Sequence, residues 1–107
     1  MKLIIAVVNR DDANDVVRNL SRNGFSSTRL STTGGFLLAG NTTLLVGVEE
    51  EQVDRAMVLI RECAHSRRLL VAPSSEINYS YFPAMPVEVT VGGATVFVVD
   101  VERFEHL

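Results

Sequence analysis

The chain has 107 residues, of which 47% are hydrophobic and 21% are charged, and its formal net charge is −3. This composition is typical of one folded domain with a real core and excludes a disordered chain. The negative net charge argues against binding to a nucleic-acid polymer, and no apolar run approaches the length of a membrane span. The single cysteine, Cys63, excludes an intrachain disulfide. We therefore expect a soluble domain in the reducing cytoplasm, with no membrane partner.

The amino-terminal segment predicts a central strand followed by a helix. Residues 3–8 form a continuous apolar run rich in β-branched side chains, which is typical of a strand covered on both faces. Asp11 and Asp12 provide N-cap chemistry, and the apolar residues that follow repeat with helical spacing. Gly24 is expected to end this helix in the left-handed conformation.

Two further strands are predicted around a glycine-rich loop. Residues 25–33 and 42–48 have strand character and are expected to pair as a hairpin, with residues 32–43 at its tip. Glycines in this loop let backbone N–H groups approach a ligand closely, and its one aromatic side chain offers a flat face for stacking. Such a loop suits nucleotide binding, although the same composition also occurs in plain hairpin connections.

The next segment predicts a second helix. Residues 49–51 are three glutamates, which favour a helix start, and the buried stripe of the helix is expected to run from Val53 to Ala64. Arg67 and Arg68 are interpreted as cations at the end of this helix.

Strands dominate the rest of the chain. A short strand is expected at residues 69–72, and residues 73–86 form the longest loop, with all three prolines and both tyrosines. Residues 87–91 alternate as a strand, and 94–101 are the final strand. We interpret Gly92-Gly93 between them as a tight hairpin turn.

This order of elements predicts an α+β fold, a ferredoxin-like βαββαβ sandwich with an added terminal hairpin. Two helices are expected to cover one face of an antiparallel sheet. The other face then needs another cover, because the strands supply more apolar surface than two helices can bury. Self-association is the economical solution, and the residues assigned to the excess surface are Leu44, Val46, Val89, Val91, Phe97 and Val99.

Two segments of the chain resemble a known family. They are residues 32–43, with the sequence Thr-Thr-Gly-Gly-Phe-Leu-Leu-Ala-Gly-Asn-Thr-Thr, and residues 86–98, which include Val-Gly-Gly-Ala-Thr-Val-Phe-Val. Both are similar to segments of the PII-like cyclic-di-AMP receptors of bacteria (the PstA or DarA type of signalling protein). The resemblance covers residues 1–107 as a single PII-like domain, with 32–43 as the short ligand loop and 73–86 as the long loop.

The resemblance implies a function and a set of binding residues. Members of this family are homotrimers that bind cyclic di-AMP in clefts between subunits and are not enzymes. Ligand binding is expected to change the conformation of both loops and so signal to an unidentified protein partner. No cofactor or metal is implied. The positions that match ligand-binding residues are Thr28, Gly35, Phe36, Leu37, Asn41, Gly47 and Phe97, the last from across the subunit boundary.

The chain departs from the family pattern just before Thr28. Family members often carry Asn-x-Arg there, whereas this chain has Gly24 and Ser26. A serine does not replace a guanidinium as a phosphate donor, and Arg29 has the wrong strand parity to do so, which leaves Arg22 as the arginine that could reach around to this position. Two other functions therefore stay open: a sensor of a related nucleotide, and a ligand-free trimer with a structural or protein-binding role. An enzyme is disfavoured, because no acid–base pair or metal-ligand spacing is present.

Overall fold

The computed structural model describes residues 1–30, 40–71 and 87–107. The elements in this part of the chain are β1 (Lys2–Asn9), α1 (Arg10–Arg22), β2 (Thr28–Leu30), β3 (Asn41–Val48), a 3-10 helix η1 (Glu50–Gln52), α2 (Val53–Ala64), β4 (Ser66–Val71), β5 (Val87–Gly92) and β6 (Ala94–Asp100). The predicted α+β, βαββαβ-like fold with an additional hairpin is confirmed. None of the described helices is long and apolar enough to cross a membrane.

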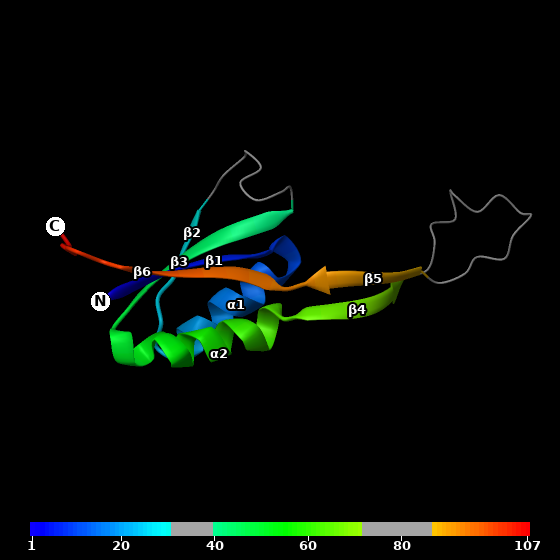
Figure 1. The fold of residues 1–107 in the computed structure, drawn as a ribbon, viewed down its shortest axis with the longest axis horizontal. Helices are drawn as coiled ribbons and strands as arrows, with labels where there is room; N and C mark the ends of the chain where they lie inside the picture. The colour runs from blue at the N-terminus through cyan, green and yellow to red at the C-terminus, as the bar shows by residue number, and fades with distance from the viewer. Residues whose placement is uncertain (31–39, 72–86) are drawn as a thin grey trace, which may run out of the picture.

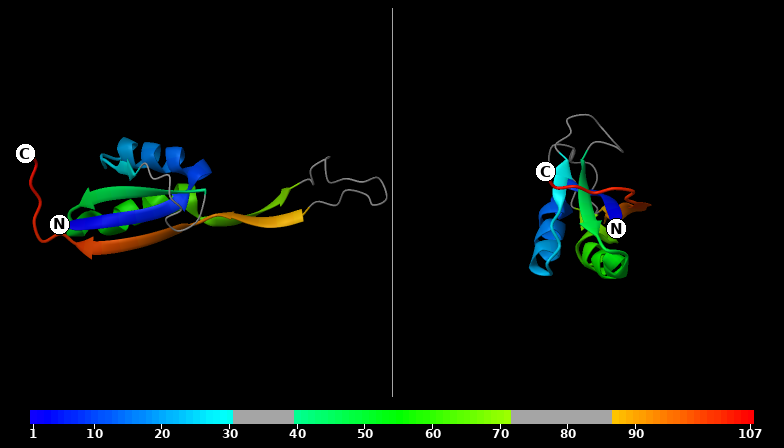
Figure 2. Two further views of the ribbon diagram at one scale, coloured as in Figure 1. Left: turned by 90° about the horizontal axis from the view of Figure 1, so that it is seen from above. Right: turned by 90° about the vertical axis from the view of Figure 1, so that its left-hand side faces the viewer.

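One four-stranded antiparallel sheet forms the body of the molecule, in the order β2-β3-β1-β6. Both α-helices lie side by side on the same face of this sheet (Figures 1 and 2). The register places Ile4 opposite both Val46 and Val98, so alternate residues of these strands share a face.

The helix-covered face of the sheet contains the hydrophobic core. Leu44 and Val46 are fully buried there and pack with Val16 and Ile60 of the helices. Their assignment to the excess apolar surface is therefore wrong, because their strand parity turns them toward the helices. Phe97 and Val99, from the same predicted set, are exposed.

Helix α1 begins and ends at well-defined caps. The side chain of Asn9 accepts a hydrogen bond from the backbone N–H of Asp11 at 2.9 Å, so the cap precedes the predicted Asp11 and Asp12. At the other end Gly24 has a φ of +85°, and its backbone N–H donates to the carbonyl of Ser21 at 3.1 Å. This left-handed end confirms the prediction for Gly24.

The additional hairpin consists of β4 and β5, which form a separate two-stranded sheet that projects from the body as an arm (Figure 1). The arm is inserted between α2 and the last strand of the main sheet. Arg67 and Arg68 lie on β4, so their assignment to the end of a helix is wrong.

The predicted hairpin turn at Gly92-Gly93 is also wrong. β5 pairs with β4 and β6 pairs with β1, so the chain continues through the two glycines from the arm into the main sheet. Their φ angles are +77° and +90°. Two adjacent residues in this conformation suit a primed turn, but here they let one strand leave one sheet and enter another.

Candidate functional site

The sheet face opposite the helices, called the open face below, brings together residues from four strands. Among its members, Phe97 is 48% exposed and Val99 is 41% exposed, whereas Val7 and Thr43 are buried. The strand register assigns to this face Leu3, Ile5, Val7, Asn9, Thr28, Leu30, Asn41, Thr43, Leu45, Gly47, Thr95, Phe97 and Val99. All four predicted binding residues that the structure describes, Thr28, Asn41, Gly47 and Phe97, belong to it.

Thr28 and Phe97 lie on opposite edges of the open face. One row across the sheet runs from Thr28 through Leu45 and Ile5 to Phe97. Three strand spacings separate the two ends of this row, which is roughly 14 Å. A single base cannot contact both side chains of the same subunit at this distance.

Gly47 leaves a recess, a position without a side chain, near the end of the open face that lies farthest from Asn41. It lies in the interior of β3, opposite Leu3, and is exposed. A Cβ atom built at Gly47 would have no atom of the described residues within 4 Å, so none of these neighbours requires glycine here. Glycine inside a strand costs stability and often marks a place where a ligand or another backbone approaches closely. The recess is therefore a candidate position for a ligand group.

Asn41 lies at the end of the open face, where the glycine-rich loop joins β3. It is paired in register with Asn9, the residue that caps α1. The backbone N–H of the next residue, Arg10, donates to the carbonyl of Gly40 at 2.7 Å. This end of the open face is thus attached directly to the first turn of α1.

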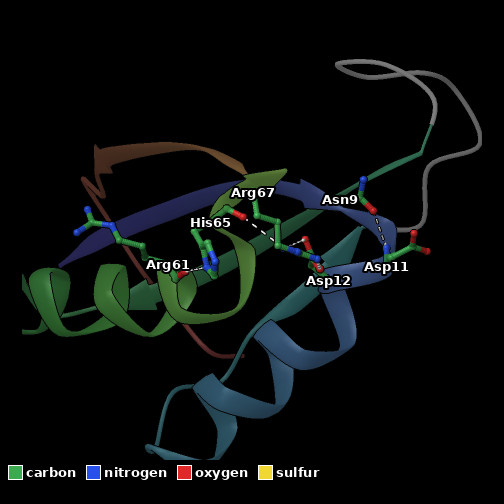
Figure 3. A network of polar contacts seen from close by, with 6 residues as sticks. All are labelled: Asn9, Asp11, Asp12, Arg61, His65 and Arg67. Carbon is green, nitrogen blue, oxygen red and sulfur yellow. Dashed lines mark hydrogen bonds and ion pairs between the residues drawn. The ribbon is translucent and has the colours of Figure 1, made fainter. Parts of the chain in front are cut away.

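An ion pair attaches the arm to the same turn of α1 (Figure 3). The guanidinium of Arg67 on β4 donates to the nearly buried carboxylate of Asp12, with an Nη2–Oδ1 distance of 2.9 Å. This contact raises the pKa of Arg67 above its ordinary value. A Cβ at Gly92 would lie 2.6 Å from Nη1 of Arg67 and 2.7 Å from the carbonyl oxygen of His65. The close packing explains why glycine is needed at position 92.

The pair of Asp12 and Arg67 was not predicted from the sequence. The two residues are separated by 55 positions, and no local pattern connects a helix cap with a strand of the arm. The one available signal was the aspartate itself, since a carboxylate at a helix start next to apolar positions favours a buried partner.

The charge of the open face is low. The register places no lysine, arginine or histidine on the described part of this face. Arg29 lies on the opposite side, as its parity predicted, and its Nη2 donates to Oδ1 of Asn14 at 2.8 Å. Ser26 is exposed. Arg22 lines a pocket of about 400 Å³ between the two helices, on the side of its own subunit away from the open face.

The described part of the chain adds neither a metal site nor an activated thiol to the candidate site. Gly35, Phe36 and Leu37 lie outside the described residues. Among the described residues no group of three or more His, Cys, Asp or Glu side chains could hold a metal ion. Cys63 is partly buried on α2, and burial raises the pKa of its thiol above the ordinary value, which disfavours the reactive thiolate.

Comparison with known proteins identifies the family. A family model described as "Cyclic-di-AMP receptor" matches residues 1–107. The fold is similar to the crystal structure of a functionally unknown protein from Pediococcus pentosaceus ATCC 25745, with 40% sequence identity and a TM-score of 0.79. That match covers 99% of this chain and 96% of the other. The resemblance inferred from the two sequence segments is thus confirmed over the whole chain.

Proposed function

This chain belongs to the cyclic-di-AMP receptor family, a family of non-enzymatic signalling proteins, and we propose that it binds cyclic di-AMP on the open face. The observation that carries the proposal is the placement of Thr28, Asn41, Gly47 and Phe97. These residues come from β2, β3 and β6, and the register turns all four toward the same face. The opposite face of these strands is occupied by the core and the helices, so a ligand has access from one side only.

The chemistry of this face suits an adenine base. The recess over Gly47 has apolar neighbours and can receive a flat ring. It lies six residues from Asn41 along β3, roughly 20 Å, so one base does not contact both residues of the same subunit. Asn41 has an amide that donates and accepts at once, which matches the N6 and N7 edge of adenine. Thr28 adds a hydroxyl, and Phe97 offers an aromatic face for stacking.

The distance between Thr28 and Phe97 favours a site shared by two subunits. β2 and β6 are the edge strands of the main sheet, and β6 exposes apolar side chains on both of its sides, Phe97 with 48% and Val98 with 42% of their surface. Exposed apolar residues on an edge strand favour contact with another chain. We propose a homotrimer in which β6 of one subunit completes the site beside β2 and β3 of its neighbour.

The proposed output is a conformational change that a protein partner reads. Asn41 lies where the 32–43 loop joins β3, and the arm that carries the 73–86 loop is attached to α1 one turn from this point. A ligand at Asn41 therefore acts close to the end of the 32–43 loop and to the base of the arm, whose far end leads into the 73–86 loop. The identity of the protein partner is not specified by these residues.

Calorimetry tests the ligand. Purified protein is titrated with cyclic di-AMP, cyclic di-GMP and ATP, and its mass in solution is measured by light scattering. We expect a trimer that binds cyclic di-AMP most tightly. Phe97→Ala should weaken this binding, whereas Phe104→Ala, which removes a comparably exposed aromatic outside the sheet, should not. Absence of heat with all three nucleotides would contradict the proposal.

A ligand-free trimer that serves protein binding is the second candidate. The observation that favours it is the lack of cationic side chains on the described part of the open face, because a cyclic dinucleotide carries two negative phosphates. This alternative predicts the mass of a trimer without any thermal shift on addition of nucleotides.

A further inference from the structure

The proposed ligand needs a positive partner that the open face does not supply. Each of the two phosphodiesters of a cyclic dinucleotide carries a negative charge, and a charge moved out of water requires a paired or hydrogen-bonded group. If the proposed function holds, on which this inference rests, a cation of this chain must meet the ligand.

All ten lysine and arginine residues lie in the described parts of the chain, and most of them are already engaged. The engaged side chains have a carboxylate or amide partner and are Lys2, Arg18, Arg29, Arg55, Arg67, Arg68 and Arg103. Within these described parts, Arg10, Arg22 and Arg61 have no such side-chain partner. One of these three is therefore the best source of a free guanidinium.

Position separates the three arginines. Arg10 is the first residue of α1, and its backbone N–H is bonded to the carbonyl of Gly40 at 2.7 Å, next to Asn41. Arg22 is the last residue of the same helix, roughly 18 Å farther along the axis at 1.5 Å per residue. Arg61 lies on α2, beneath the sheet, and its side chain points away from the arm and from α1 (Figure 3).

The helical periodicity also directs Arg10 toward β2. Residues four apart lie on the same side of a helix, so Arg10 shares a side with Asn14. Asn14 faces the helix-covered side of β2, because its Oδ1 accepts a hydrogen bond from Arg29 of that strand at 2.8 Å. Arg10 therefore meets the open face around the end of the sheet, where Gly40 joins β3. The core stripe of α1, with Ala13 and Val16, lies on a different side, and Arg10 is exposed.

We propose that Arg10 supplies the guanidinium that pairs with a phosphodiester of the bound cyclic dinucleotide. A guanidinium is always charged and offers a planar fork of donors that matches two phosphate oxygens. Of the acidic groups in this turn, Asp12 is already neutralised by Arg67, while Asp11 is an exposed carboxylate that opposes the interaction in part. Arg10 thus sets the affinity and the salt dependence of binding, while the neighbouring Asn41 contacts the edge of a base.

The test uses the full-length protein and two matched variants. Arg10→Gln and Arg22→Gln each remove one exposed guanidinium of α1 that has no carboxylate or amide partner among the described residues, so both should fold with unchanged thermal stability. We expect Arg10→Gln to weaken binding of cyclic di-AMP about tenfold or more, since hydrogen bonds to charged groups have effects of this size. Arg22→Gln should stay within about twofold, and Arg10→Lys should recover part of the loss.

Salt dependence gives an independent readout. If Arg10 contacts a phosphate, the affinity of the wild-type protein should fall with added salt, and Arg10→Gln should reduce this slope. Equal affinities for wild type and Arg10→Gln, or equal losses for Arg10→Gln and Arg22→Gln, would overturn the inference. Absence of binding by the wild type would instead contradict the proposed function, so the two failures are distinguishable.

Discussion

The two faces of the main sheet are built from the same strands but differ in what they present. On the helix-covered face, Ile4, Leu44 and Val46 are completely buried. On the open face, their neighbours Ile5 and Leu45 are partly exposed, Gly47 leaves a recess, and Phe97 is half exposed. The comparison shows how one short sequence serves two purposes, since alternate residues of a strand can stabilise the fold and meet a ligand independently.

Two adjacent leucines of β3 test the difference between the two faces, with the largest expected effect on stability. Leu44→Ala should lower the free energy of unfolding by about 2–5 kcal/mol, because it leaves a cavity in the core under the helices. Leu45→Ala removes the same atoms from the open face and should cost much less. Chemical denaturation at one fixed protein concentration measures both. Equal losses for the two variants would contradict the assignment of the faces.

Gly47 allows binding and stability to be separated. Gly47→Val should fill the recess without a clash, since a Cβ there meets no atom within 4 Å, and should leave the protein as stable or up to about 1 kcal/mol more stable. The same side chain should weaken cyclic di-AMP binding about tenfold or more by occupying the space of the base. Calorimetry and thermal unfolding of one preparation give both values. Unchanged affinity would exclude Gly47 from the site.

The ion pair at the base of the arm should respond asymmetrically to truncation. Arg67→Ala leaves the nearly buried carboxylate of Asp12 without its partner, whereas Asp12→Ala leaves a guanidinium that already reaches water. We therefore expect Arg67→Ala to lower the thermal stability more than Asp12→Ala does. The control is Arg68→Ala, which breaks the exposed ion pair between Arg68 on β4 and Glu88 on β5. This variant should change the thermal stability little. The reverse order of Arg67→Ala and Asp12→Ala would show that the pair is not desolvated.

The smallest expected effect is a pH dependence at the far end of the sheet. The ammonium of Lys2 on β1 lowers the pKa of Asp100 on β6 through a hydrogen bond and an ion pair. A carboxylate with a lowered pKa in the folded state stabilises fully above its ordinary pKa, and this contribution disappears as the pH falls through the lowered value. Asp100→Asn should thus slightly reduce the dependence of the free energy of unfolding on pH in the acidic range. A profile identical to that of the wild type would show that the pair contributes nothing.

Local patterns in the sequence predicted most of the fold. The apolar run of β1, the glycine at the end of α1 and the β2–β3 hairpin are all encoded by neighbouring residues, and these predictions are confirmed. The incorrect predictions concern local patterns that are compatible with two different three-dimensional arrangements. Gly92-Gly93 suits a hairpin turn, yet it connects two sheets here, and Arg67-Arg68 follows a helix but belongs to the arm.

The candidate site was predictable only in part. Family resemblance supplied Thr28, Asn41, Gly47 and Phe97, but it could not tell that Thr28 and Phe97 lie on opposite edges of one sheet. That fact depends on strand order, which is a long-range property. Arg10 carries no motif at all, and its position emerges only when Gly40 is brought to the start of α1.

A subunit-mixing experiment tests the shared site most directly. Asn41→Ala and Phe97→Ala subunits with different affinity tags are coexpressed, and mixed trimers are isolated through both tags and titrated with cyclic di-AMP. If Asn41 and Phe97 of neighbouring subunits form each site, both parent trimers bind poorly, and every mixed trimer regains one intact site, about one third of the wild-type capacity. Mixed trimers that bind no better than their parents would show that the two residues do not complete a site across the subunit boundary.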